Sequence, residues 1–208
     1  IVLVVSDHGA KQMKGAFCIN QWLMQEGYLK IKGNPERGAR LEDTQIDWSQ
    51  TKAWGWGGYY ARIFINVEGR EPQGTVTPED YEKTLGELAE KLKQIRGPNG
   101  EKLDNKVYKP EEIYEELNGD SPDLIVYFDD LYWRSAGTIG YETLYLSEND
   151  TGPDDAVHSE YGIFILYVPT KKLGLELENI NILDVAPTVL NILGIRVPKE
   201  MRGKIITW

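Results

Sequence analysis

The chain has 208 residues, of which 41% are hydrophobic, a content that allows a folded domain with a buried core and excludes general disorder. Its 23 basic and 33 acidic side chains give a net charge of −10, which disfavours both nucleic-acid coating and anionic membranes. No apolar run reaches the roughly 20 residues that cross a bilayer. Cys18 is the single cysteine, so an internal disulfide is excluded and a reducing, cytoplasmic location is expected.

The first five residues form a continuous apolar run rich in β-branched side chains. Such a run predicts a strand buried on both faces of a parallel sheet. Free-standing proteins rarely begin inside their central sheet, so we expect this sequence to be a fragment. Residues 17–24 have the apolar spacing of a helix that Gly27 ends, and residues 28–31 then predict a short strand.

The middle of the chain alternates between long loops and regular elements. Residues 34–58 are polar and glycine-rich without a period, and a loop of this length usually has a function. A strand is predicted at residues 60–67. Thr77 and Pro78 then begin a helix that ends before Gly97, and a second, shorter helix with inward-facing apolar residues is predicted at residues 109–119.

The last third continues in the same way. Residues 123–128 predict another central strand, residues 129–158 a long acidic loop, and residues 161–168 a further strand. Asp184 caps a final helix that Gly194 ends. Strands that alternate with helices predict an α/β fold with a mostly parallel sheet, whose ligands gather beyond the carboxyl ends of the strands.

Two histidines are candidate metal ligands. His8 follows the first predicted strand directly after Asp7, and the two side chains can converge on one ion only where the strand has ended, with Gly9 supplying the freedom to turn. The alternative is an Asp that caps a helix beside a structural histidine. His158 lies just before a predicted strand, and its alternative is an ordinary, half-buried loop histidine.

The aromatic segment at residues 47–70 allows two interpretations. Its rings could stack on a nucleotide base while Arg62 or Arg70 holds a phosphate. We favour the other interpretation, in which the rings pack the loop onto the domain as a small satellite core. The acidic pairs Asp129-Asp130 and Asp154-Asp155 are expected to form solvated turns, with cation binding as the alternative.

Several segments together resemble a known family. Residues 5–9, Val-Ser-Asp-His-Gly, resemble the metal-ligand motif of the alkaline phosphatase superfamily, and residues 184–203 resemble the closing helix and strand of the same superfamily. The segments between them resemble the prokaryotic type I phosphodiesterase/nucleotide pyrophosphatase branch; they are residues 47–54, 57–62, 69–72 and 149–155.

This resemblance implies an α/β/α sandwich with a mostly parallel central sheet, alkaline-phosphatase-like and truncated at the N-terminus. Residues 1–208 would be the C-terminal part of the catalytic domain, with a substrate-side insertion at about residues 34–120. Asp7 and His8 would bind one of two divalent ions and His158 the other, with zinc expected and manganese as the alternative. The Thr or Ser nucleophile, which becomes phosphorylated, would lie upstream of Ile1.

The implied reaction is hydrolysis of phosphodiester or pyrophosphate bonds in a small phosphate ester or nucleotide. Arg62, Arg70 and Tyr59 are the candidate substrate-binding residues. With three ligands and no nucleophile, these residues alone would bind metal weakly and be inactive. The alternatives are a phosphomonoesterase, sulfatase or metal-dependent phosphoglycerate mutase of the same superfamily, or a non-catalytic binding module. Truncation would also expose apolar surface for self-association.

Overall fold

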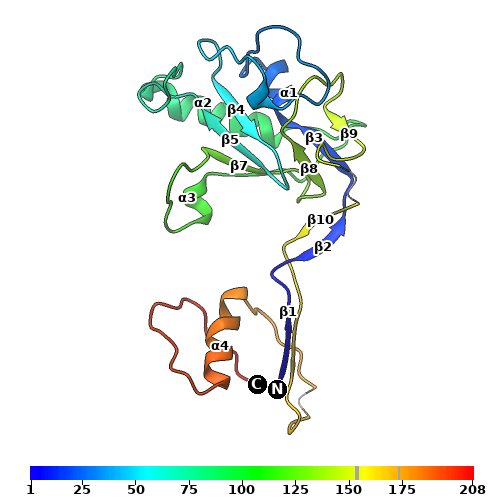
Figure 1. Ribbon diagram of the computed structural model, residues 1–208, viewed down its shortest axis with the longest axis vertical. Coiled ribbons are helices and arrows are strands. Elements are labelled where there is room, and N and C mark those ends of the chain that lie inside the picture. The colour runs from blue at the N-terminus through cyan, green and yellow to red at the C-terminus, as the bar shows by residue number, and fades with distance from the viewer. Residues whose placement is uncertain (153–154, 173) are drawn as a thin grey trace. The chain divides into compact units, whose positions relative to one another are not determined.

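The computed structural model of the chain describes residues 1–152, 155–172 and 174–208. It divides into two compact units, each described by itself below (Figure 1). The first unit contains Ile1–Gly9 and Ser159–Trp208, and the second contains Ala10–His158. None of the helices formed by the described residues is both long and apolar enough to span a membrane.

A four-stranded sheet forms the centre of the second unit. Its order is β4-β5-β7-β6, and every neighbouring pair is antiparallel. The strands are β4 (Ala53–Trp56), β5 (Ala61–Ile65), β7 (Leu124–Tyr127) and β6 (Lys106–Tyr108). Side chains alternate between the two faces of β4 and β5, so that Ala53, Gly55 and Ile63 are buried while Trp54 and Trp56 lie on the outer face.

A second, three-stranded sheet has the order β8-β3-β9. β3 (Gly15–Cys18) runs parallel to β8 (Trp133–Ala136) and antiparallel to β9 (Tyr145–Leu146). A separate pair joins β2 (Gly9–Gln12) to β10 (Ala156–Ser159).

The prediction of a mostly parallel central sheet is wrong for the described residues. Only β3 and β8 run parallel among the pairs whose register the structure gives, and the other pairings are antiparallel. The reason lies in the connections. β4 and β5 are joined by four residues, 57–60, and a parallel pair needs a crossover of a dozen residues or more.

The helices of the second unit are α1 (Ile19–Gln25), α2 (Pro78–Lys93) and the single turn α3 (Pro110–Ile113), with a short 3-10 turn at Leu41–Asp43. α2 confirms the helix predicted from residues 77 and 78, since the Thr77 hydroxyl accepts a hydrogen bond from the Asp80 N–H at 3.2 Å. α1 packs on β4, and α2 packs on β6 and β7. One core cluster contains the buried leucines of α2 and Phe17, whose ring centroid lies 4.6 Å from that of Phe128.

The second predicted helix is shorter than expected. α3 ends at Ile113, and the apolar residues predicted to face inward, Ile113, Tyr114 and Leu117, are exposed. Four glutamates at positions 111, 112, 115 and 116 crowd this segment, and like charges four residues apart destabilise a helix.

Cys18 is buried in β3. Burial raises the pKa of its thiol to about 12, so the group is uncharged and unreactive at neutral pH. Its role is that of a small apolar side chain.

The first unit contains β1 (Val2–Val5) paired antiparallel with β11 (Phe164–Tyr167), a 3-10 turn at Ile182–Asp184 and α4 (Val185–Ile192). The expectation that residues 1–5 are buried on both faces is wrong. Val2 is 54% and Val4 44% exposed, as are their partners Tyr167 and Ile165 at 58% and 56%. Among the described residues, no helix or further strand covers the face of the two-stranded sheet that carries these four side chains. Self-association through it stays a prediction.

The motif that opens α4 joins this helix to the end of the chain. The Asp184 carboxylate accepts hydrogen bonds from the N–H groups of Asn181, at 3.0 Å, and Lys204, at 2.7 Å. The Thr188 hydroxyl donates to the Asp184 carbonyl and accepts from the Ile206 N–H at 2.9 Å. These side chains therefore hold residues 204–206 against the start of α4.

This arrangement predicts a pH-dependent stability of the first unit. The hydrogen bonds from the Lys204 and Asn181 N–H groups lower the pKa of Asp184. A lowered pKa in the folded state adds stability above the unfolded value, near pH 4, and that stability is lost as the pH falls through the folded pKa. Because the carboxylate is solvent-accessible, we expect Asp184→Asn to remove less than about 1 kcal/mol at pH 7 and to reduce the loss of stability on acidification. Urea unfolding at several pH values measures both, and an unchanged pH profile would contradict the assignment.

Candidate metal and substrate site

Asp7 and His8 follow β1 after one residue, Ser6, and lie in the first unit. The Asp7 Oδ1 accepts a hydrogen bond from the His8 N–H at 3.1 Å. The His8 Nδ1 lies 2.8 Å from the carbonyl oxygen of Gly9. A carbonyl only accepts, so Nδ1 donates the hydrogen in this contact and Nε2 is the ring nitrogen that could bind an ion. Such a contact on the far nitrogen is typical of histidines that bind metals.

The distance between the two side chains fits a shared ion. His8 Nε2 lies 3.7 Å from Asp7 Oδ1. Zinc bonds are about 2.0–2.1 Å to nitrogen and about 2.0–2.2 Å to oxygen, so two ligands of one ion lie at most about 4.3 Å apart. Both atoms can therefore bind one ion. Within the described parts of the chain, no three His, Cys, Asp or Glu side chains gather as a metal site.

Gly9 has a different role from the one expected. Its φ is not in the left-handed region, so freedom to turn does not require glycine there. A Cβ at this position would lie 2.2 Å from the carbonyl oxygen of Tyr161. Glycine is needed because the backbone after His8 passes directly against the backbone before β11.

Asp7 also lines a cavity of about 810 Å³ in the first unit. The other residues of its lining are mostly apolar and include Val5, Ile163, Leu175 and Trp208. Polar side chains also line it, among them Glu160 and Glu176, so the cavity combines apolar walls with several carboxylates.

His158 lies in β10, in the second unit, and contacts Tyr59. The two ring centroids are 3.6 Å apart at an interplanar angle of 57°. Arg134, on strand β8, is buried, with 8% of its surface exposed. Its guanidinium lies 4.4 Å from the centroid of the Tyr59 ring. The structure thus brings the predicted metal ligand His158 and the predicted substrate-binding residue Tyr59 together, and adds Arg134.

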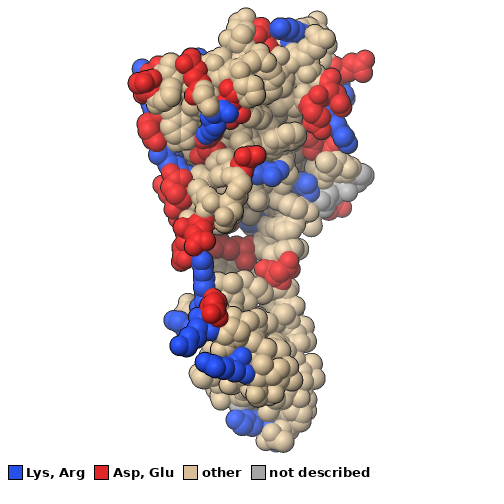
Figure 2. Space-filling view, turned by 60° about the vertical axis from the view of Figure 1, so that its left-hand side comes forward, with Lys and Arg blue, Asp and Glu red and all other residues tan. Residues whose placement is uncertain are grey.

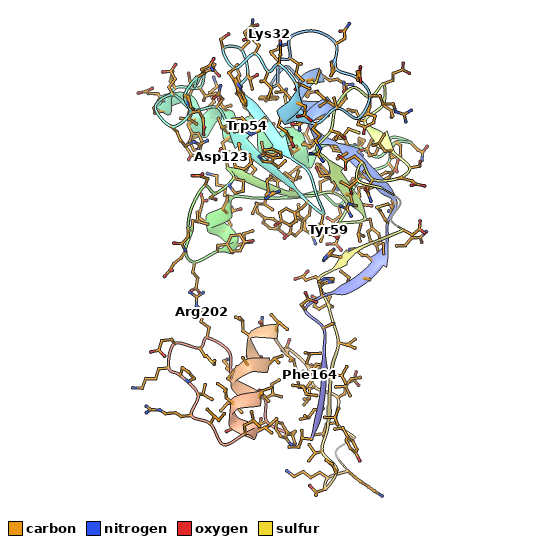
Figure 3. The ribbon with its side chains drawn as sticks, viewed as in Figure 1. Lys32, Trp54, Tyr59, Asp123, Phe164 and Arg202 are labelled. Atoms are coloured by element: carbon orange, nitrogen blue, oxygen red, sulfur yellow. The ribbon has the colours of Figure 1, made fainter. Side chains whose placement is uncertain are left out.

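The hairpin that carries Tyr59 is held against β8 by its backbone (Figure 3). Gly58 and Ser135 exchange two hydrogen bonds, with N–O distances of 2.7 and 2.9 Å. A Cβ on Gly57 would lie 2.4 Å from the Ser135 carbonyl oxygen, so only glycine allows this approach. These contacts place Tyr59 beside Arg134. Sequence reasoning missed Arg134, because residues 129–158 were predicted to form a loop, whereas the structure places Arg134 in the wholly buried strand β8.

Strained backbone precedes this strand. Asp129, Asp130 and Leu131 have φ angles of 50°, 51° and 68°, a left-handed conformation rare for residues other than glycine. The Lys14 Nζ lies 2.6 Å from Asp129 Oδ2, and the Lys106 Nζ lies 2.7 Å from Asp130 Oδ1.

The acidic pair at residues 129–130 is therefore an ion-paired turn rather than a solvated one. The hydrogen bond from Lys106 lowers the pKa of Asp130. Bound lysines neutralise the carboxylates that a cation would need. The second pair includes Asp154, which lies outside the described residues.

Arg70 has partners within the protein. Its Nη1 and Nη2 each lie 2.7 Å from an Asp123 carboxylate oxygen, and its Nε lies 3.0 Å from Glu71. The hydrogen bonds to Asp123 raise the pKa of the Arg70 guanidinium. Since its donors are used, the structure favours a structural role over the expected phosphate contact. Arg62 lies on the exposed face of β5, opposite Trp56.

Comparisons with known proteins agree with the motifs. The sequence model of the family described as type I phosphodiesterase / nucleotide pyrophosphatase matches residues 1–154. Similar relatives are the 2,3-bisphosphoglycerate-independent phosphoglycerate mutases of Francisella tularensis subsp. tularensis (strain WY96-3418), subsp. holarctica (strain LVS) and subsp. novicida (strain U112). Each is 40% identical over 57 residues, 27% of this chain.

The chain spans only a small part of these relatives, since the matched segment is 11% of their length. No solved structure matches the chain. The family match, in contrast, covers well over half of the chain. The chain therefore belongs to the type I phosphodiesterase/nucleotide pyrophosphatase family of the alkaline phosphatase superfamily.

Proposed function

We propose that the intact protein is a metal-dependent hydrolase of phosphodiester or pyrophosphate bonds in small phosphate esters or nucleotides. The observation that carries the proposal is the pair Asp7 and His8, with ligand atoms 3.7 Å apart and the far nitrogen of His8 on the Gly9 carbonyl. This geometry occurs in a member of a phosphodiesterase family. Members of the superfamily are metal-dependent.

In this proposal Asp7 and His8 bind one divalent ion, zinc or manganese, and His158 contributes to a second. When bound, such ions neutralise the charge that develops on the phosphoryl oxygens. Asp7 supplies a carboxylate oxygen, and His8 supplies Nε2, with the ring orientation held by the contact between Nδ1 and the Gly9 carbonyl. A Thr or Ser nucleophile from outside these 208 residues would carry the phosphoryl group.

Substrate recognition is proposed for the second unit. Tyr59, which is 39% exposed, is the proposed substrate contact, and the guanidinium of the buried Arg134 packs against its ring. Residues 34–120 would be the substrate-side insertion, and the exposed Arg62 remains a candidate contact. We propose a cytoplasmic location.

Assays of the intact protein on matched substrates test this function. We expect faster hydrolysis of bis(p-nitrophenyl) phosphate than of p-nitrophenyl phosphate or p-nitrophenyl sulfate, abolished by a chelator and restored by zinc or manganese. Preference for the monoester or the sulfate would instead indicate a phosphomonoesterase or sulfatase. Because the relatives are named phosphoglycerate mutases, interconversion of phosphoglycerates is the second candidate activity. Absence of all four activities would favour a binding module.

The contact between Tyr59 and His158 predicts a separate effect. Tyr59→Ala removes the ring that contacts both His158 and Arg134, and we expect about a tenfold loss in kcat/KM for the diester, a typical cost of losing a group that orients a ligand histidine. Tyr59→Phe keeps the ring and is the matched control, with activity near that of the unmodified protein. Equal losses in both variants would mean that the hydroxyl, rather than the ring contact, matters.

A further inference from the structure

A second cavity lies on the outer face of β4, within the second unit. Its volume is about 470 Å³. Six residues of its lining carry the argument: Trp48, Trp54, Trp56, Glu42, Glu71 and Asn66. None of the residues proposed above to bind metal or substrate lines it.

Three indole rings form the walls because of the strand period. Trp54 and Trp56 are two residues apart on β4 and so point to the same face. Trp54 also packs against the core cluster, whereas Trp56 is 41% exposed. Trp48 meets Trp54 edge-on, with ring centroids 5.1 Å apart and planes at 84°. Phe64, opposite Trp54 on β5, stacks on it at 5.4 Å. The rings thus pack together, as the interpretation favoured from the sequence expected. The indole planes of Trp48 and Trp54 are nearly perpendicular and form a corner of the cavity.

Asn66 holds the walls in place. It is 1% exposed, and the two hydrogens of its Nδ2 are shared among the carbonyl oxygens of Trp48, Thr51 and Gln73, at 3.0, 2.8 and 2.8 Å. These bonds tie the segment that carries Trp48 to the residue that follows β5. A site whose walls are fixed in advance loses less entropy when it binds a ligand.

The charges at the cavity are negative. Glu42 and Glu71 line it, and no Lys or Arg is found among the lining residues that the structure describes. Arg40 lies 3.9 Å from Glu42, at the limit of an ion pair. Arg70 lies 3.0 Å from Glu71 but is shared with Asp123. Acidic side chains are also frequent on the face of the second unit in Figure 2.

We propose that this cavity binds an organic cation, specifically an alkylammonium group. Indole faces are the aromatic surfaces that attract cations best, and the two carboxylates add attraction of the same sign. A nucleotide, the ligand considered from the sequence, fits less well, since its phosphate would lie near two carboxylates. The site does not depend on the hydrolase activity proposed above.

Tetramethylammonium tests the proposal, with 2,2-dimethylpropan-1-ol as a neutral ligand of similar branched shape. The six tryptophan indole N–H signals in a two-dimensional NMR spectrum report the site. At constant ionic strength, we expect saturable shifts of the signals of Trp48, Trp54 and Trp56 with tetramethylammonium. The other three tryptophans, Trp22, Trp133 and Trp208, serve as internal controls.

Matched charge variants separate the cavity from the net charge of the chain. Glu42→Gln keeps the side-chain shape and should weaken binding by about fivefold. Glu111→Gln on α3 removes the same charge away from the cavity and should leave the affinity unchanged. The proposal is overturned by equal binding of the neutral alcohol, by equal effects of the two variants, or by the absence of saturable shifts. Each of these outcomes leaves the hydrolase proposal untouched.

Discussion

Replacing His8 with Ala in the intact protein is expected to lower the rate of phosphodiester hydrolysis by about a thousandfold, the usual cost of losing one group that stabilises transition-state charge. The imidazole Nε2 is 3.7 Å from Asp7 Oδ1 and is the second of the two atoms that fit one ion. Without it Asp7 alone would hold that ion. Elemental analysis of the purified variant should show one divalent ion fewer per chain than in the unmodified protein.

Two further variants make the experiment specific. Asp7→Asn changes the other proposed ligand and should give the same loss of metal and activity. Asp120→Asn makes the same chemical change at an exposed residue of the second unit and should have no effect. Circular dichroism checks that each variant is folded. Near-normal activity with a full metal content in either His8→Ala or Asp7→Asn would show that these residues are not the ligands.

Replacing Asp123 with Ala is expected to cost about 3 kcal/mol in the free energy of unfolding. This buried carboxylate accepts four hydrogen bonds: from the Ile65 N–H at 2.6 Å, from the Tyr81 hydroxyl at 2.7 Å, and from two nitrogens of Arg70 at 2.7 Å each. Breaking a buried ion pair from one side costs about 3–5 kcal/mol. We take the lower end because the Arg70 side chain is 42% exposed and can be hydrated.

Urea unfolding measures this cost, and Tyr81 provides a second readout. Burial, together with the hydrogen bond to Asp123, raises the pKa of Tyr81, so Asp123→Ala should lower it toward its ordinary value in a spectroscopic titration. Tyr81→Phe removes a single hydrogen bond and should cost about 1 kcal/mol. A loss below that value in Asp123→Ala would contradict the arrangement.

The same ion pair distinguishes a structural from a substrate-binding Arg70. Arg70→Met should lower stability, because Asp123 loses its charged partner. At a temperature where the variant is folded, its KM for the diester should be unchanged. A raised KM with unchanged stability would restore the phosphate contact expected from the sequence.

Features that depend on neighbouring residues could be read from the sequence. The start of α2 follows from a hydroxyl at position 77 and a proline at position 78, and its buried face follows from leucines at helical spacing. Asp7 and His8 are adjacent in the sequence, so both side chains can reach one ion if the strand ends before them. The motifs of residues 1–154 likewise identified the family.

Tertiary structure decided what depends on residues far apart in the chain. Arg70 meets Asp123 across 53 positions, and no local pattern marks it as structural rather than phosphate-binding. Burial of residues 1–5 depends on which layers cover β1, while strand direction depends on how short the connections are. Tyr59, Arg134 and His158 come from a hairpin and two separate strands. A sequence pattern records which side chains are available, whereas their partners are selected by packing and by the hydrogen bonds that buried polar groups must make.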